Sequence, residues 1–206
     1  MASFYERRVL PKILGWACSQ NPINRQRMKI VPAAEGRVLE LGIGMGLNLR
    51  HYDPAKVSEV LGVDPAAELR TMAEAAERDP KLKVRVEDGT AESLPFDDAS
   101  FDTIVCTFTL CSVCTPALAL AEAKRVLKPG GRFLFCEHGL SPDADVAKWQ
   151  RRVDPVWKRL FGGCHLSRPV SGGLEAAGFK VERLETMYLP KTPRIAAWNE
   201  WGVARP

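Results

Sequence analysis

The sequence predicts an α/β fold: a mostly parallel sheet of seven strands, with helices on both faces and an antiparallel C-terminal edge strand. Three observations predict it. Strand-like runs alternate with helical stretches from Gly36 onward, a glycine-rich turn follows the buried run 38–41, and Asp64 follows the next run, 60–63. A buried strand, a tight glycine turn and an acid at the end of the next strand are typical of α/β domains that bind a nucleoside.

The first five strands and the helices between them follow one rhythm. The strand-like runs are residues 37–41, 59–63, 83–87, 101–107 and 132–137. The helix predicted at 66–78 is rich in Ala, Glu, Leu and Met, and the helix at 116–127 begins with a proline and ends before Lys128-Pro129-Gly130-Gly131, a stop signal. Right-handed crossovers place all the carboxyl ends of such strands on one edge, where we expect the ligand.

The rhythm changes after the fifth strand. A long amphipathic helix is predicted at 143–161, a short helix at 170–177, and two final strands at 180–188 and 195–204 that fit an antiparallel edge of the sheet. Trp149, Trp157 and Phe161 either line an acceptor pocket or pack the long helix against the core. The sequence leaves both interpretations open.

Residues 1–35 are predicted to form a helical segment outside the α/β domain, which spans residues 36–206. Apolar residues recur there at helical spacing between positions 9 and 17, with basic residues on the other side. The segment is an ordinary helix covering the sheet, a cap that folds Tyr5 over the ligand site, or a membrane-surface contact made by residues 1–18. We expect a cytoplasmic protein, and the last interpretation would make it peripheral to the inner membrane face.

Composition and charge narrow the classes of function that the sequence predicts. With 206 residues and 46% hydrophobic content, the chain can bury a sizeable core. The net charge of +4 without a long Lys/Arg run does not predict a nucleic-acid partner, and a monomer or a dimer is equally compatible. The six cysteines lie mostly in strand-like runs, which indicates a reduced protein. Cys111 and Cys114 form a C-x-x-C pair without a second pair, so no metal site is predicted.

The glycine turn decides which nucleoside is expected. Gly42, Gly44 and Gly46 give G-x-G-x-G, whereas the dinucleotide fingerprint needs Gly or Ala where this chain has Leu47. No G-K-[ST] follows, so a phosphate-cradling P-loop is excluded.

Further motifs follow in order. Residues 87–96 (EDGTAESLPF) follow the third strand, residues 97–102 lead into the fourth, and residues 125–131 (RVLKPGG) precede the fifth. Together with Glu40 and the glycine turn, these motifs resemble the class I S-adenosylmethionine-dependent methyltransferases over residues 36–139. The resemblance implies S-adenosyl-L-methionine as the methyl donor, S-adenosyl-L-homocysteine as the product and a Rossmann-like fold.

The subgroup it resembles is the ubiquinone/menaquinone-biosynthesis type. Within that subgroup, residues 109–113 (TLCSV), 137–138 (EH) and 163–168 (GCHLSR) are similar to methyltransferase-like thiol S-methyltransferases. Bacterial phospholipid N-methyltransferases are a neighbouring resemblance.

The resemblance also implies roles for individual residues. Glu40 would meet the donor's ammonium or hold the turn, Asn48 and Leu49 would begin a helix facing its carboxylate, and Asp64 would bind the ribose, cap the helix after Pro65, or do both. The adenine loop departs from the family pattern, because Thr90 stands where an acid is usual. The residues expected to bind the donor are Tyr5, Glu40, Gly42, Gly44, Gly46, Asn48, Leu49, Asp64, Pro65, Gly89, Thr90, Ala91, Glu92 and Thr107.

The expected reaction is methyl transfer to a small, lipophilic acceptor. Thiol S-methylation is slightly favoured over N-methylation of phosphatidylethanolamine, and a non-catalytic S-adenosylmethionine-binding module is a further alternative. Methyl transfer does not require a base, but a thiol acceptor with a pKa of about 8.5 would benefit from one. His138 and His165 are the candidates, and a structural hydrogen bond is the alternative role for each. No covalent step through Cys164 is expected.

Overall fold

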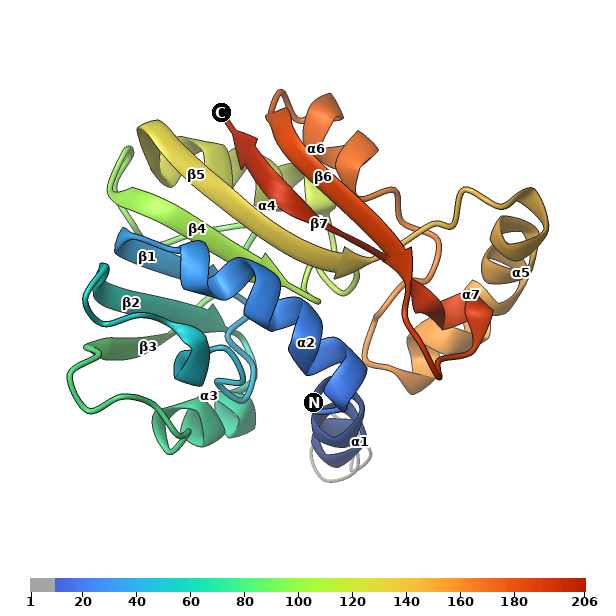
Figure 1. The fold of residues 1–206 in the computed structure, drawn as a ribbon, viewed down its shortest axis with the longest axis horizontal. Helices are drawn as coiled ribbons and strands as arrows, with labels where there is room; N and C mark the ends of the chain where they lie inside the picture. The colour runs from blue at the N-terminus through green and yellow to red at the C-terminus, as the bar shows by residue number, and fades with distance from the viewer. Residues whose placement is uncertain (1–9) are drawn as a thin grey trace.

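The strand-like runs of the sequence come together in one seven-stranded sheet with the order β3-β2-β1-β4-β5-β7-β6 (Figure 1). The computed structural model describes residues 10–206. The strands are β1 (Gly36–Leu41), β2 (Val57–Asp64), β3 (Val84–Asp88), β4 (Phe101–Thr107), β5 (Leu127–His138), β6 (Lys180–Tyr188) and β7 (Trp198–Arg205). The helices are α1 (Leu10–Cys18), α2 (Asn21–Ile30), α3 (Ala67–Glu74), α4 (Pro116–Val126), α5 (Ala144–Leu160), α6 (Ser171–Ala176) and α7 (Arg194–Ala197).

The pairing of the strands confirms the predicted mixed sheet. β1 pairs in parallel with β2 and β4, β2 with β3, and β4 with β5. β7 lies between β5 and β6 and pairs antiparallel with both. The carboxyl ends of β1 to β5 therefore share one edge, and α1, α5 and α7 lie beyond that edge (Figure 1).

Helices cover both faces of the sheet, as predicted. On one face, α4 and α6 bury Leu120 and Leu174 against Phe101 and Phe133. On the other face, Ile30 at the end of α2 is buried with residues of β1, β5 and α3. Both cores consist of apolar side chains removed from water, the main favourable contribution to folding.

Several predicted elements are wrong at their ends. The helix expected at 66–78 ends at Glu74, and the fifth strand, expected from residue 132, begins at Leu127. The helix expected from Asn48 and Leu49 is only a three-residue 3₁₀ helix (Leu49–His51), too short to present a sizeable helix dipole. The strand expected at 195–204 begins at Trp198, because residues 194–197 form α7 after Pro193. The fixed φ of a proline is compatible with the position just before a helical turn. The sequence pattern did not distinguish this turn from the strand that follows it.

The N-terminal helices approach the edge that carries the glycine turn. A Cβ built on Gly15 of α1 would lie 2.8 Å from Met45 Cε, and one built on Gly162 would lie 2.9 Å from Leu10 Cδ2. α1 therefore lies between the glycine turn and the loop after α5. Of the helices that the structure describes, none is both long and apolar enough to cross a bilayer. The predicted domain boundary at residue 35 stays a prediction.

Candidate active site

The glycine turn after β1 has the geometry of a ligand loop. Gly42, Gly44 and Gly46 all have positive φ angles, of 65°, 55° and 73°. Side chains other than glycine rarely adopt that conformation. A Cβ on Gly42 would lie 2.5 Å from Thr109, whereas one on Gly44 would meet no described heavy atom closer than 3.9 Å. The backbone of Gly44 therefore borders open space, which a ligand can approach closely.

Asp64 connects the end of β2 to this turn. Its Oδ2 accepts a hydrogen bond from Gly44 N at 3.0 Å, and its Oδ1 accepts one from Ala66 N at 2.9 Å. Burial raises the pKa of the Asp64 carboxyl, although these backbone donors act against the rise. Each carboxylate oxygen thus accepts one backbone hydrogen bond and stands beside the turn, which is compatible with the predicted ribose contact. The predicted helix cap is wrong, because α3 begins after Ala66 and no side chain caps it. Pro65, next to Asp64, is exposed.

Glu40 is buried in β1 and is held by two side chains. Its Oε1 accepts a hydrogen bond from Asn48 Nδ2 at 2.9 Å, and its Oε2 accepts one from Tyr52 Oη at 2.7 Å. Burial raises the pKa of Glu40 to about 7, despite these hydrogen bonds and the charge of Arg27. Among the described residues, the hydrogen-bond partners of Glu40 are the side chains of Asn48 and Tyr52 and not amides of the glycine turn.

Arg27 of α2 is a component that the sequence did not reveal. It is only 6% exposed, and its guanidinium donates to Asn48 Oδ1 at 2.9 Å and to Thr107 Oγ1 at 2.6 Å. Thr107 also accepts from Asn48 Nδ2 at 2.9 Å, so the predicted residues Asn48 and Thr107 share one buried network with Glu40. Arg27 Nε has no hydrogen-bond partner among the described residues. Buried donors are usually paired, so this atom is an exception within the buried network.

The remaining residues that were predicted to bind the methyl donor have different environments in the structure. Leu49 is fully buried in the core beside α3, so its side chain is occupied by packing. Ala91 is likewise buried, while Thr90 is exposed and pairs with Ser93 in an isolated bridge after Gly89. Glu92 accepts from the backbone N–H groups of Cys114 and Thr115, at 2.7 and 3.2 Å, and so holds the loop before α4. Tyr5 lies outside the described residues.

The loop after β4 joins the glycine turn to a second set of side chains. Thr109 Oγ1 donates to Leu41 O at 3.0 Å. Glu137 Oε1 of β5 accepts from the backbone N–H groups of Thr109 and Leu110, at 2.7 and 3.1 Å. Cys111 follows two residues after Thr109. The loop is therefore fixed between the ends of β1 and β5.

An apolar cavity of about 340 Å³ opens beside this loop. Its walls come from the loop after β4, the end of β5, α4, α6 and the segment that leads into α6. They include Leu110, Cys111, Leu120, His138, Arg168 and Val170. Trp149, Trp157 and Phe161 do not line this cavity. Trp149 is 55% exposed, and Trp157 stacks on Phe161 with ring centroids 4.1 Å apart.

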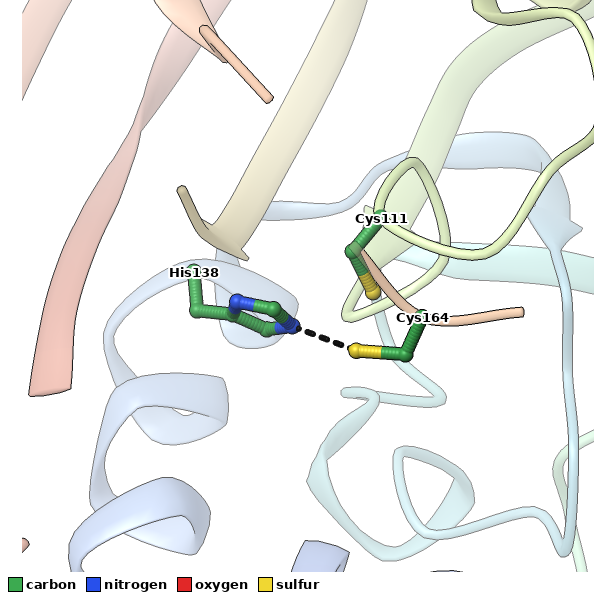
Figure 2. A group of neighbouring side chains, drawn as sticks. All are labelled: Cys111, His138 and Cys164. Carbon is green, nitrogen blue, oxygen red and sulfur yellow. Dashed lines mark hydrogen bonds between the residues drawn. The ribbon is translucent and has the colours of Figure 1, made fainter. Parts of the chain in front are cut away.

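His138, one of the two predicted bases, ends β5 at the wall of this cavity. Its Nε2 lies 3.1 Å from the Sγ of Cys164, which comes from the loop after α5. Figure 2 shows the Cys111 thiol directed toward the same space. The nitrogen and both sulfurs lie within 4.8 Å of one another. The structure thus groups Cys111 with Cys164 rather than with Cys114, which is exposed.

His165, the other predicted base, forms a pair with Asp154 of α5. His165 Nδ1 and Asp154 Oδ2 are 2.7 Å apart, and Leu166 N donates to Asp154 Oδ1 at 2.6 Å. His165 N also donates to Cys111 O at 2.8 Å, which places the His165 backbone next to the cysteine cluster. A carboxylate on Nδ1 orients an imidazole and leaves its Nε2 as the proton acceptor.

Comparison with known proteins identifies the family. The sequence profile described as "Methyltransferase domain" matches residues 39–135. A thiol S-methyltransferase of Rattus norvegicus is 36% identical over 170 residues, which cover 78% of this chain and 69% of the relative. A demethylmenaquinone methyltransferase of Paenarthrobacter aurescens is 29% identical over 198 residues, covering 93% and 70%.

A solved structure supports the same fold. A SAM-dependent methyltransferase from Thermotoga maritima matches with a TM-score of 0.67 at 23% identity, covering 96% of this chain and 95% of that one. The predicted fold and the predicted resemblance are therefore both confirmed. The chain belongs to the class I S-adenosylmethionine-dependent methyltransferases and is a member of the family that includes the thiol S-methyltransferases.

Proposed function

We propose that this enzyme transfers a methyl group from S-adenosylmethionine to the sulfur of a small, apolar thiol. The observation that carries the proposal is the apolar cavity beside the loop after β4, in a chain whose similar relatives include thiol S-methyltransferases. A thiol is a small acceptor with one polar atom, so an apolar wall suits the rest of the molecule.

The residues at the edge of the sheet fit the methyl donor. Gly44 borders open space where the amino-acid part can approach the backbone, and Arg27 Nε is a buried donor without a described partner that suits its carboxylate. Asp64 is an acceptor beside the turn for the ribose hydroxyls, and Gly89 begins the adenine loop. We assign Glu40, Asn48 and Thr107 to the support of this site through their shared network.

Methyl transfer depends mainly on the alignment of the acceptor sulfur, the methyl carbon and the donor sulfur. Bound S-adenosylmethionine supplies an electrophilic methyl group on a positively charged sulfur. The residues of the loop after β4 then position the acceptor sulfur in line with that methyl group, because Thr109 contacts the glycine turn and Cys111 lines the cavity. Such positioning can contribute on the order of 7–11 kcal/mol.

His165 is our candidate for the proton acceptor. Asp154 holds its Nδ1, whereas the Nε2 of His138 already faces Cys164. We expect His165→Asn to lower kcat for a thiol while leaving the affinity for the methyl donor within about twofold, because the loss concerns proton removal and not donor binding. Equal loss of kcat and donor affinity would instead assign His165 a structural role.

We also propose that α1 acts as a cap over the donor site. Gly15 of α1 approaches Met45 of the glycine turn, and Leu10 approaches Gly162 of the loop after α5. A membrane contact through residues 1–18 is the competing role. Binding to anionic vesicles that disappears on removal of those residues would favour the membrane.

A direct assay tests the proposal. The protein is incubated with isotopically methyl-labelled S-adenosylmethionine and matched acceptors that differ only in the reacting atom: an alkane thiol, the corresponding alcohol and the corresponding amine. We expect a labelled thioether from the thiol alone. Vesicles containing phosphatidylethanolamine form a further arm, and labelling of that lipid in preference to the thiol would establish the phospholipid alternative. Donor binding without turnover in any arm would contradict the proposal.

A further inference from the structure

We infer that Cys111, His138 and Cys164 form a zinc site whose open position binds the acceptor thiol. This inference rests on the proposed thiol S-methylation and assigns to these three residues the task of holding and ionising the acceptor. The three side chains come from the loop after β4, the end of β5 and the loop after α5, and they converge on one point (Figure 2). Two of them, Cys111 and His138, line the apolar cavity.

The geometry is close to that of a tetrahedral site. Zinc bound at about 2.3 Å from sulfur and about 2.0 Å from an imidazole nitrogen requires ligand atoms about 3.5–3.8 Å apart. Here Nε2 of His138 and Sγ of Cys164 are 3.1 Å apart, and all three ligand atoms lie within 4.8 Å of one another. Side-chain rotations that move the ligand atoms by a few tenths of an ångström up to about one ångström bring them to that spacing.

The ligand set indicates a catalytic rather than a purely structural ion. Two cysteines and one histidine leave the fourth position of a tetrahedral zinc site open, which is the pattern of catalytic sites. Cys111 and His138 line the cavity, so the open position faces the space that we assign to the acceptor. Cys114, the other cysteine of the C-x-x-C pair, is exposed and is not one of the three clustered groups.

The surroundings explain why a metal ion is useful here. Cys111 is buried, so its thiolate requires a nearby cation to offset the loss of solvation. A divalent zinc ion displaces the protons of coordinating thiols and balances the charge of the two thiolates.

The same effect would activate the substrate. An acceptor R–SH that takes the fourth position releases its proton, which His165 accepts, and its thiolate remains on the ion. The sulfur electron pair then forms the new S–CH3 bond, while the bond between the methyl carbon and the donor sulfur breaks and leaves its electron pair on that sulfur. The products are a neutral thioether R–S–CH3, which is a weak ligand and departs, and S-adenosylhomocysteine. No oxidant or reductant is consumed.

Metal analysis tests the site without relying on activity. The full-length protein is stripped with a chelator, exposed to excess Zn²⁺, desalted and analysed by mass spectrometry for metals. We expect about one zinc ion per chain, lost in Cys111→Ser and in Cys164→Ser. The matched control is Cys114→Ser, which removes a cysteine three positions from Cys111 and should keep the zinc. Absence of zinc from the wild type, or equal zinc in all three variants, would overturn the inference.

Cobalt substitution provides a readout on unmutated protein. Co²⁺ in a tetrahedral site with thiolate ligands gives intense visible bands and a sulfur-to-metal charge-transfer band. Addition of an alkane thiol without a methyl donor should increase the charge-transfer intensity, because a third sulfur joins the ion, and the matched alcohol should not. An unchanged spectrum with the thiol would refute substrate coordination.

The two proposals fail in different ways. If the zinc-free protein methylates thiols as fast as the zinc-loaded protein, the metal inference is wrong and the proposed function stands. If the protein binds zinc and the cobalt spectrum responds to thiols but no thiol is methylated, the metal site stands and the proposed function is wrong.

Discussion

Glu40 provides a quantitative test of the buried network behind the glycine turn. Burial raises its pKa from 4.5 to about 7. A raised pKa in the folded state means that the folded protein keeps a proton that the unfolded chain has already released. Glu40 therefore lowers the free energy of unfolding least below about pH 4.5. This destabilisation grows as the pH rises toward 7 and is complete above about pH 7.

The magnitude follows from the two pKa values. They differ by about 2.5, and each unit corresponds to about 1.36 kcal/mol, so the full cost is about 3 kcal/mol. Between about pH 5 and about pH 8 the expected change is about 2.5 kcal/mol, since part of the cost is already present at pH 5. Glu40→Gln has nearly the same shape and cannot ionise; its amide oxygen can accept from Asn48, and its amide nitrogen can donate to the Tyr52 hydroxyl.

Urea unfolding at several pH values measures this contribution. The free energy of unfolding of the wild type minus that of Glu40→Gln should fall by about 2.5 kcal/mol from about pH 5 to about pH 8. Glu74→Gln, which removes an exposed carboxylate of α3, is the control and should give a curve parallel to the wild type. Parallel curves for Glu40→Gln as well would refute the reasoning, because Glu40 would then titrate alike in both states.

Two further predictions concern the same edge. Gly42→Ala should lower the free energy of unfolding by about 2–5 kcal/mol, because it combines a left-handed φ with a Cβ 2.5 Å from Thr109, whereas Gly44→Ala should cost only about 1–2 kcal/mol yet weaken donor binding. Urea unfolding and titration calorimetry separate the two, and equal stability losses would count against the open space above Gly44. Arg27→Met should cost about 1–3 kcal/mol, since it removes the donor to Asn48 and Thr107. It should also move the pH dependence assigned to Glu40 to higher pH; an unchanged pH window would exclude Arg27 as its electrostatic partner.

The sequence predicted the parts of this fold that depend on local pattern. Alternating strand and helix runs, the glycine turn and the acid after β2 are contiguous signals, and each corresponds to an element in the structure. The helix expected after Asn48 is absent because Leu49 packs into the core and the chain turns away after one 3₁₀ turn. The helical turn before β7 was missed because Trp198 and its neighbours continue the apolar pattern across the boundary.

The parts of the site that the sequence did not reveal are made by long-range contacts. Arg27 lies in a polar helix with no motif, and its burial depends on Asn48 and Thr107, which lie 21 and 80 residues away. Cys111, His138 and Cys164 come from two loops and one strand end that lie far apart in the sequence, so no local spacing could group them. The C-x-x-C spacing instead drew attention to Cys114, which is exposed.

The central claim is that the glycine turn and Asp64 hold the methyl donor, with the Asp64 carboxylate on the ribose. Its most direct test is titration calorimetry of S-adenosylhomocysteine and its 2′-deoxy analogue with the wild type and with Asp64→Asn, read as a double-mutant cycle. Loss of a hydrogen bond to a charged group costs about 1.5–3 kcal/mol, so the wild type should bind the deoxy analogue roughly 10- to 150-fold more weakly. The variant should bind both ligands with similar, reduced affinity. Wild-type affinity of Asp64→Asn for S-adenosylhomocysteine would contradict the account.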